Sequence, residues 1–488
     1  MSDHSAGHEN APSLRFVTDA PVASIETGLI RAHAFAALAS LMIAALLGTI
    51  VAVKLVQPEF LGGHVQTTWG SMRANHTQGI FFGWFGNAFL AFFYFAVPRL
   101  GGRAVMSRRL GWILFGLWNV GVVLLGWVLV SLNPANYFLA IKPLEWTEFP
   151  LIVNAVTEIC LVLMALQFIP PLARQPNRDG MYVSSWYILG GLIFTLLAFP
   201  VGSLVPEWAP GAVGAAFSGL WIHDAVGLYI TPLALAMAFY IFPVRTGRPI
   251  YSHFLSMLGF WLLFFSYPLN GTHHYVYSSI PMDTQRAAIA ASVIMGFDVM
   301  LVVFNLLMSL RGQATLVARD VPLRFVWTGV VIYLIVSLQG SLQALMPMQR
   351  YLHFSDWVIG HSHLAMLGFG AFIVLGGIAH VWQRSPHFHY HHGYMNWAYW
   401  LILSGLAIMF IDLTAAGLMQ GKLWISDAPW MDSVRASKNF WLIRAFAAAP
   451  ILVGFAAFIA GLLINADNRS ANNPRLSNSA MQPVPAHG

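Results

Sequence analysis

Long apolar stretches alternate with short polar connections along this chain. Twelve such stretches can be marked, at residues 33–56, 74–98, 110–132, 149–171, 183–205, 215–243, 253–275, 287–310, 324–346, 357–382, 396–420 and 440–464. A helix of about 20 residues crosses a hydrocarbon layer of about 30 Å, so each stretch predicts one transmembrane helix. The runs are continuous, which excludes a barrel of alternating strands. We expect an all-α, polytopic membrane protein: a bundle of 12 transmembrane helices in residues 31–465, between polar tails at 1–30 and 466–488.

Composition places the chain in the lipid bilayer. Of its 488 residues 58% are hydrophobic and only 9% are charged. The net charge is +6, but the basic residues are scattered singly between apolar stretches, so no nucleic-acid partner is predicted. The only cysteine, Cys160, lies in an apolar stretch, which excludes an internal disulfide, a paired-cysteine metal site and covalent haem attachment through CxxCH.

Arginine fixes the expected orientation. The connections after even-numbered stretches hold Arg99, Arg103, Arg108, Arg109, Arg174, Arg178, Arg245, Arg248, Arg311, Arg319, Arg324 and Arg384. Basic loops are retained in the cytoplasm, so both tails are predicted to be cytoplasmic. Residues 1–30 lack the basic start and apolar core of a signal peptide.

Six histidines lie within the predicted spans: His76, His223, His273, His274, His361 and His363. A single membrane histidine is usually bonded to a neighbouring helix. With this orientation, however, all six fall in the outer half of the bilayer. His361 and His363 point about 200° apart around one helix, so they serve opposite sides. His273 and His274, with a third histidine, make a nitrogen-rich set suited to copper, iron or zinc.

The sequence around these histidines resembles a known superfamily. The strings are RANH at 73–76, HDAVG at 223–227, GTHH at 271–274 and SDWVIGHSH at 355–363, supported by GLMQG at 417–421 and LIRA at 442–445. In this order, over roughly residues 30–465, they resemble the haem–copper oxidases, most closely the catalytic subunit I of C-type (cbb3-type) cytochrome c oxidase. The resemblance implies a multi-pass protein of the bacterial inner membrane that reduces O2 to water, coupled to proton uptake.

The resemblance also assigns cofactors and partners. His76 and His363 would hold a low-spin haem b, His361 a high-spin haem b, and His223, His273 and His274 copper. Arg73 and Arg444 resemble the family's haem-propionate partners. The alternative is that these arginines extend their side chains to the lipid headgroups. Electrons would come from cytochrome c or a similar donor through membrane-anchored c-type cytochrome subunits. Glu145 and Glu148 resemble a calcium site, and plain loop acids would look the same.

Tyr267 is the strongest sequence argument for oxygen chemistry. It lies six residues before His273, where the family keeps a catalytic tyrosine linked to the histidine that is here His223. A phenol there can supply an electron and a proton. The alternative is that Tyr267 is only an amphipathic residue at the outer membrane interface. Ser252 and Ser256 align below Tyr267 and would conduct protons, or bond the preceding helical turn.

Some residues depart from the family pattern and keep alternatives open. Gln339 replaces a family glutamate, and Asp224 and Asp298 add carboxylates. Nitric oxide reductases share the scaffold and use iron for copper, but their usual glutamate is Gly227 here and they lack the tyrosine. A transporter or haem carrier would explain single histidines, but not the complete set. His387, His389, His391 and His392 are predicted to lie outside the site, although His-rich tracts do bind metals.

Overall fold

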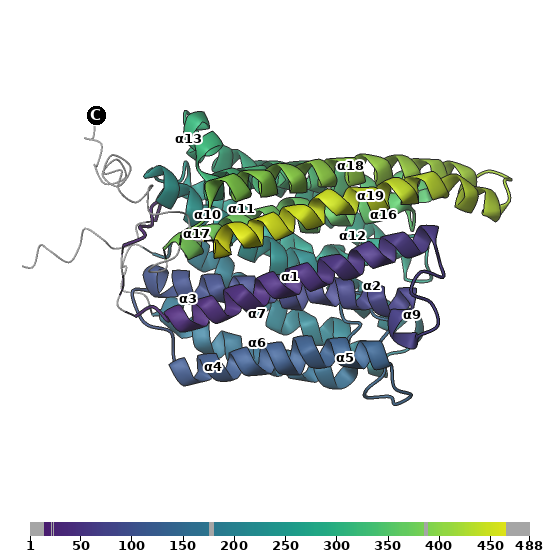
Figure 1. The fold of residues 1–488 in the computed structure, drawn as a ribbon, viewed down its shortest axis with the longest axis horizontal. Coiled ribbons are helices and arrows are strands. Elements are labelled where there is room, and N and C mark those ends of the chain that lie inside the picture. Colours follow the sequence, from purple (N-terminus) through teal and green to yellow (C-terminus); the bar gives the residue numbers. More distant parts are fainter. Residues whose placement is uncertain (1–13, 21, 23, 175–179, 385–388, 465–488) are drawn as a thin grey trace, which may run out of the picture.

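The computed structural model describes residues 14–20, 22, 24–174, 180–384 and 389–464. Within them the chain forms a bundle of 12 membrane-length spans, without a strand in the part described (Figure 1). The predicted all-α fold is therefore confirmed. The spans are α1 (Thr27–Val56); α2 (Trp69–Gln78), η3 (Gly79–Gly86) and α3 (Asn87–Gly101); α4 (Arg108–Gly116), η4 (Leu117–Leu124) and α5 (Leu125–Leu132); α6 (Leu151–Ala173); α7 (Val183–Ser203) with α8 (Val205–Trp208); α9 (Gly211–Asp224), η5 (Ala225–Ile230) and α10 (Thr231–Thr246); α11 (His253–Asn270) with η6 (Gly271–Tyr275); α12 (Met282–Ser309); α14 (Val321–Gln343); α16 (Asp356–His363), η7 (Leu364–Ala371) and α17 (Phe372–Gln383); α18 (His392–Trp424); and α19 (Trp430–Leu463). Short connecting helices are η2 (Val65–Thr67), α13 (Ala314–Arg319) and α15 (Met346–Leu352).

Several helices extend beyond the predicted stretches. The last two stretches, expected at 396–420 and 440–464, belong to helices of 33 and 34 residues. At a rise of about 1.5 Å per residue each is about 50 Å long, and together they project past the other helices as a hairpin (Figure 1). Hydropathy detects only the lipid-buried part of a helix, so it underestimates helices that continue into water.

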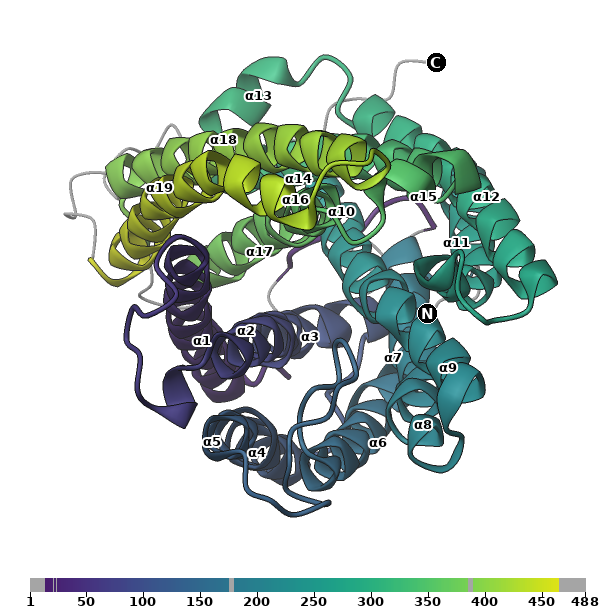
Figure 2. The same ribbon diagram turned by 90° about the vertical axis from the view of Figure 1, so that its right-hand side faces the viewer.

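Three spans form the interior of the bundle. In the second, sixth and tenth spans 94%, 94% and 89% of the apolar window is buried, against 61% or less in the other nine. Viewed along the bundle (Figure 2), α2–α3, α10 and α17 are surrounded by the remaining spans. These three spans carry four of the six histidines, His76, His223, His361 and His363.

Wide helical turns interrupt the same three spans. The π-helical segments η3, η5 and η7 begin three, two and one residues after His76, His223 and His363. A π turn inserts a residue and rotates everything beyond it, and such turns are frequent at functional sites. A fourth π segment, η4, lies in the third span, which carries no candidate ligand.

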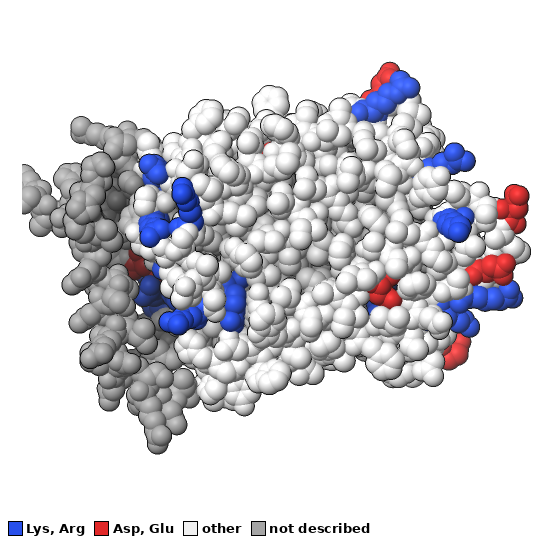
Figure 3. All heavy atoms as spheres, turned by 90° about the horizontal axis from the view of Figure 1, so that it is seen from above, with Lys and Arg blue, Asp and Glu red and all other residues white. Residues whose placement is uncertain are grey.

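Basic residues gather where α1 begins, called the near end below; the opposite end is the far end (Figure 3). All the arginines used above for orientation lie at the near end, either in connections or in the helical turns next to them, except Arg178, which is outside the described residues. At the far end acidic and basic side chains are mixed (Figure 3). The arginines that the sequence predicts on one side of the membrane therefore lie together at one end of the bundle.

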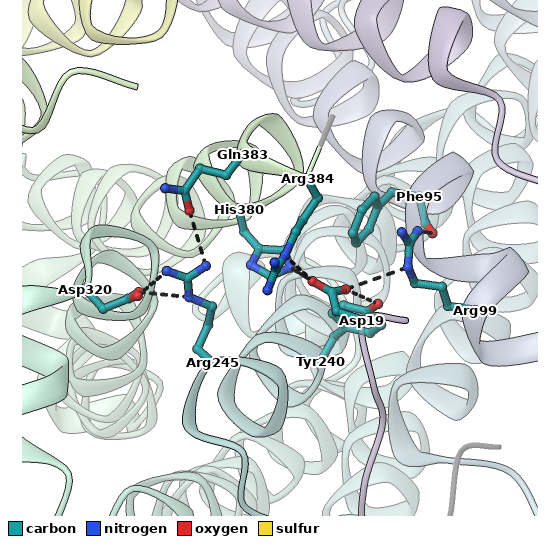
Figure 4. Close-up of polar contacts among 9 residues, drawn as sticks. All are labelled: Asp19, Phe95, Arg99, Tyr240, Arg245, Asp320, His380, Gln383 and Arg384. Atoms are coloured by element: carbon teal, nitrogen blue, oxygen red, sulfur yellow. Dashed lines mark hydrogen bonds and ion pairs between the residues drawn. The ribbon is translucent and has the colours of Figure 1, made fainter. Parts of the chain in front are cut away.

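A non-helical segment, residues 14–20, crosses the near end and is called the strap. Its Arg15 guanidinium donates to Ile250 O at 3.0 Å. Its Asp19 accepts a hydrogen bond from the Tyr240 hydroxyl at 2.8 Å, and its other carboxylate oxygen lies 3.1 Å from His380 Nε2. Arg384 and Arg99 form ion pairs with the same carboxylate (Figure 4). Burial raises the pKa of Asp19, but these basic neighbours prevail and hold it well below its ordinary value. The strap thus ties α3, α10 and α17 together.

Candidate haem and metal centre

Three histidines converge in the far half of the bundle. His223 lies at the end of α9, and His273 and His274 lie in η6. One ring nitrogen of each is within 4.8 Å of the others, with His223 Nδ1 3.1 Å from His274 Nε2. The tight 3-10 turn of η6 lets adjacent side chains share one region. Among the described residues, no other cluster of three histidine, cysteine or acidic side chains is close enough to hold a metal ion.

The donor chemistry of this set fits copper. Ser292 Oγ lies 2.7 Å from Nδ1 of His273, which leaves Nε2 of that ring to face the other two histidines. Three imidazole nitrogens without a carboxylate suit copper, zinc or iron rather than magnesium or calcium. The residues present therefore match the metal set expected from the sequence.

Tyr267 is packed directly against this set. Its ring stacks on His223, with centroids 4.9 Å apart and planes 23° apart. Gly227 lies one turn after His223, and a Cβ built there would overlap the Tyr267 ring. The side chain of Thr231 lies within hydrogen-bonding reach of Tyr267. Glycine at 227 is thus the condition for placing the phenol beside the metal ligands.

A cavity separates the three histidines from His361. It has a volume of about 230 Å³ and is lined by His223, His273, His274, Tyr267 and His361. His361 Nδ1 lies 3.0 Å from Gln339 Oε1, so Nδ1–H donates to the amide oxygen and Nε2 is left for iron. This arrangement fits a haem ligated by His361 and open toward the metal set.

His76 and His363 form a second pair on another side of α16. His76 Nδ1 is 2.7 Å from Ala44 O, and His363 Nδ1 is 2.8 Å from Ile359 O. Both Nδ1 atoms are thereby engaged and both Nε2 atoms remain for a metal. Gly48 faces the His76 ring, where a Cβ would come within 2.5 Å. Two imidazoles of this kind fit the axial positions of a six-coordinate haem.

The two candidate propionate arginines already have carboxylate partners. Arg73 donates to Glu148 Oε1 at 2.9 Å, and Gln78 donates to the same carboxylate. Arg444 lies 4.0 Å from Asp356 and within electrostatic range of His76 and His363. Burial raises the pKa of Glu148 to about 7, although Arg73 opposes the rise. Burial likewise raises the pKa of Glu145, which lines the cavity.

Sequence reasoning misses the roles of two residues at this centre. In the sequence Gln339 only marks the replacement of a family glutamate that can carry a proton. In the structure its side chain is hydrogen-bonded to His361. His353, in the connection before α16, lines the cavity beside His274, and burial lowers its pKa. In the sequence Gln339 is one amide among several in its span, and His353 is an isolated loop histidine. Neither position carries a local signal.

Comparison with known proteins agrees with this geometry. The family model described as "Cytochrome C and Quinol oxidase polypeptide I" matches residues 28–477. The protein named cbb3-type cytochrome c oxidase subunit CcoN1 of Stutzerimonas stutzeri is 27% identical over 86% of this chain and 90% of its own length. A cytochrome c oxidase subunit 1 of Rhodobacter capsulatus is 26% identical over 94% of this chain and 88% of its own.

More distant matches share the scaffold. A nitric oxide reductase polypeptide of Stutzerimonas stutzeri is 23% identical over 85% of this chain and 90% of its own length. The cryo-EM structure of a haem–copper terminal oxidase dimer superposes with a TM-score of 0.68 at 14% identity, covering 88% of this chain and 84% of that one. The last match shows the fold alone. With the family match spanning nearly the whole chain, this protein belongs to the cytochrome c and quinol oxidase polypeptide I family, the subunit I family of haem–copper oxidases.

Proposed function

We propose that this chain is the catalytic subunit of a C-type respiratory oxidase, which reduces O2 to water with electrons from cytochrome c. Tyr267 carries the proposal, because its ring lies against His223 and at the wall of the cavity that His361 and the three histidines line. Reducing O2 takes four electrons, and a phenol at this position can supply one transiently together with its proton.

The histidines divide into three roles in this proposal. His76 and His363 hold a low-spin haem b, His361 holds a high-spin haem b, and His223, His273 and His274 hold copper. These groups when bound supply the redox chemistry that binds and reduces O2. Arg444 and Arg73 neutralise haem carboxylates. Because Arg73 is already ion-paired with Glu148, its guanidinium would then interact with two carboxylates.

The chain's own residues prepare the site. Ser292 and Gln339 each engage Nδ1 of a histidine and so fix its orientation and its ligating nitrogen. The side chain of Thr231 lies beside the Tyr267 hydroxyl. The Thr231 hydroxyl is therefore close enough to exchange a proton with the Tyr267 hydroxyl.

Nitric oxide reduction is disfavoured by packing. The carboxylate usual in those enzymes would stand at position 227, where the Tyr267 ring leaves no room for a side chain. A glutamate at position 227 and Tyr267 in its present position therefore cannot both be accommodated.

The surroundings follow from the same proposal. The near end faces the cytoplasm of a bacterium, so both chain termini are cytoplasmic and the histidines lie toward the outer face. Membrane-anchored c-type cytochrome subunits deliver electrons from that side. A calcium ion near Glu145 and Glu148 would need Glu148 to turn from Arg73, and backbone carbonyls would have to complete its coordination.

Tyr267→Phe tests the function. The variant keeps the ring packed against Gly227 and His223 and removes only the hydroxyl. We expect O2 consumption by the purified complex to fall about 100-fold or more, because a positioned proton donor contributes at least that much. Haem spectra and copper content should be unchanged.

Tyr229→Phe is the matched control, since Tyr229 is a buried tyrosine of η5 that packs on Phe89 and Phe81. It should consume O2 at the parental rate. If Tyr267→Phe did so too, the tyrosine would be structural only. Metal analysis of the same preparations adds an independent check, because non-haem iron in place of copper would contradict the oxidase.

A further inference from the structure

Asp298 is a fully buried carboxylate to which the protein gives no partner. It lies in α12 with no exposed surface, and neither of its oxygens has a hydrogen bond. Asp19, Asp320 and Asp356 by contrast meet donors, namely Tyr240, Arg245 and Trp441, respectively. Asp412 also has two unpartnered oxygens and Asp224 one, but both side chains keep some exposed surface, whereas Asp298 keeps none. A carboxyl group in the bilayer is costly and is seldom kept for structure alone.

Other unpartnered hydroxyls surround it. Gly259 of α11 opens the space, and the point where its Cβ would stand is 3.4 Å from Asp298 Oδ1 and 3.6 Å from the Tyr187 hydroxyl. The hydroxyls of Tyr187 and of Tyr333 are buried without a partner. Tyr333 and Tyr267 lie within electrostatic range of Asp298, and both line the cavity that holds the three histidines. Buried polar groups require hydrogen bonds, so such a cluster suits bridging water molecules.

A separate hydrogen-bonded group lies between this cluster and the near end. Asn305 follows Asp298 by seven residues, about two turns or 10 Å along the same face of α12. Its amide donates to Ser256 Oγ at 2.8 Å and to Ser252 O at 2.9 Å, and its oxygen accepts from Ser252 N at 2.9 Å. Ser252 is the N-cap of α11. It follows Tyr251, whose carbonyl, like that of Ile250, accepts from Arg15 of the strap.

Asp298 therefore lies between two polar systems. Ser252, Asn305 and Ser256 lie on its near-end side, and Tyr333 and Tyr267, which are within electrostatic range of it, line the cavity. From Ser256 to Tyr267 the helix rises about 16 Å, too far for one hydrogen bond. Of the side chains named between the two ends, Asp298 alone carries a carboxyl that both accepts and releases a proton, because the amide of Asn305 and the serine hydroxyls do not ionise in the physiological range.

We infer that Asp298 holds a proton in transit, taking one from the Ser256–Asn305 side and giving one to the tyrosine hydroxyls at the cavity. This inference rests on the proposed function. Each transfer moves one proton and no electron, and the carboxyl returns to its starting state after each passage. The protons are those that O2 reduction consumes, so no further reactant is needed.

Asp298→Asn is the direct test, because an amide of the same size cannot exchange the proton. O2 consumption should fall about 100-fold, the range in which proton-transfer groups contribute, with haem and copper content unchanged. Asp298→Glu restores a carboxyl and should recover at least about a third of the parental rate. Glu158→Gln is the control, since Glu158 is a half-buried carboxylate of α6 with an unpartnered oxygen; that variant should retain the parental rate.

Infrared difference spectra of the reduced and oxidised complex give a readout that a structural role would not move. A carboxyl C=O band that is sensitive to deuterium should be absent in Asp298→Asn and shifted in Asp298→Glu. Parental turnover in Asp298→Asn, or a spectrum identical in the parent and Asp298→Glu, overturns the inference. If the Asn variant fails to assemble, the Glu variant alone decides through its band. A parent that consumes no O2 would refute the proposed function itself.

Discussion

The near end and the far half of the bundle use polar groups in opposite ways. At the near end Asp19 meets Arg99, Arg384, His380 and Tyr240, and Arg245 meets Asp320 (Figure 4). In the far half His223, His273 and His274 bring ring nitrogens within 4.8 Å of one another, and the Nδ1 bonds of His76 and His363 leave Nε2 of each ring for a ligand. Nearer the middle of the bundle, neither oxygen of Asp298 has a hydrogen-bond partner.

The contrast separates stabilising groups from reactive ones. A buried charge that finds its counter-charge within the chain is complete, so it stabilises the helix packing. A buried polar atom that finds none requires a ligand, a metal or a proton that the chain does not supply. Mutations should then have different consequences at the two ends: lost stability at the near end, and lost cofactors or turnover in the far half.

The largest expected effect is loss of a haem. On the proposed assignment, His363→Ala removes one axial ligand of the His76 pair and should eliminate the low-spin spectrum, while His361→Ala should eliminate only the high-spin one. Haem content and reduced-minus-oxidised spectra measure both. His33→Ala is the control, because His33 is a buried membrane histidine whose Nδ1 is bonded to Asn87 at 2.8 Å and which is not one of the six candidate ligands. Two haems with parental spectra in both ligand variants would refute the assignment.

Gly227→Ala should have the next largest effect. The added Cβ overlaps the Tyr267 ring and must displace it from His223. We expect O2 consumption to fall at least about tenfold with both haems retained, since the phenol loses its near-attack geometry. Gly247→Ala adds a methyl group where nothing lies within 4 Å, although its φ of +67° costs some stability, so turnover there should persist. An unaffected Gly227→Ala enzyme would show that the Tyr267 position is not critical.

Asp19→Asn should reduce stability and leave the spectra unchanged. It leaves Arg99 and Arg384 facing an amide, which costs about 3 kcal/mol for a buried pair. Because the folded-state pKa of Asp19 is lowered, its stabilisation is complete above the ordinary value of 3.8 and is lost as the pH falls below it. Thermal unfolding followed by haem absorbance tests both statements. Asp283→Asn, at a 96% exposed side chain, should be neutral; equal Tm values for all three proteins would contradict the comparison.

Gln339→Glu should produce a smaller, spectroscopic change. A carboxylate that accepts the His361 Nδ1–H makes the imidazole more basic, so the iron–histidine stretch should rise and the high-spin haem potential should fall. Resonance Raman spectra and a redox titration measure these shifts. Gln343→Glu, one turn away and bonded to Trp357 at 2.9 Å, should leave both unchanged. No shift in Gln339→Glu would mean that Gln339 does not act through His361.

Sequence predicted the fold well, because continuous apolar runs dictate membrane helices. It also placed the six histidines in one half, since span order and arginine position locate each helix end. It could not predict η3, η5 and η7, because a π turn depends on neighbouring helices rather than on local composition. Nor could it foresee that Gln339 contacts His361 or that Asp298 lacks a partner, because both depend on the distance between two helices that the sequence does not specify.

The smallest expected effect is at the histidine-rich connection before α18. His387 lies outside the described residues; His391 caps α18 by accepting from Tyr394 N at 3.4 Å, and its own N–H donates to Gly461 O. This is a completed contact at the near end, so the triple variant His389→Ala, His391→Ala and His392→Ala should keep parental haem and copper content. Its stability should fall by about 1 kcal/mol, the usual cost of losing an N-cap. The single variant His391→Ala should account for that fall and His389→Ala for none of it. If the triple variant lost copper, a near-end histidine would be serving the metal centre, and the division between completed and reactive groups would fail where it is easiest to test.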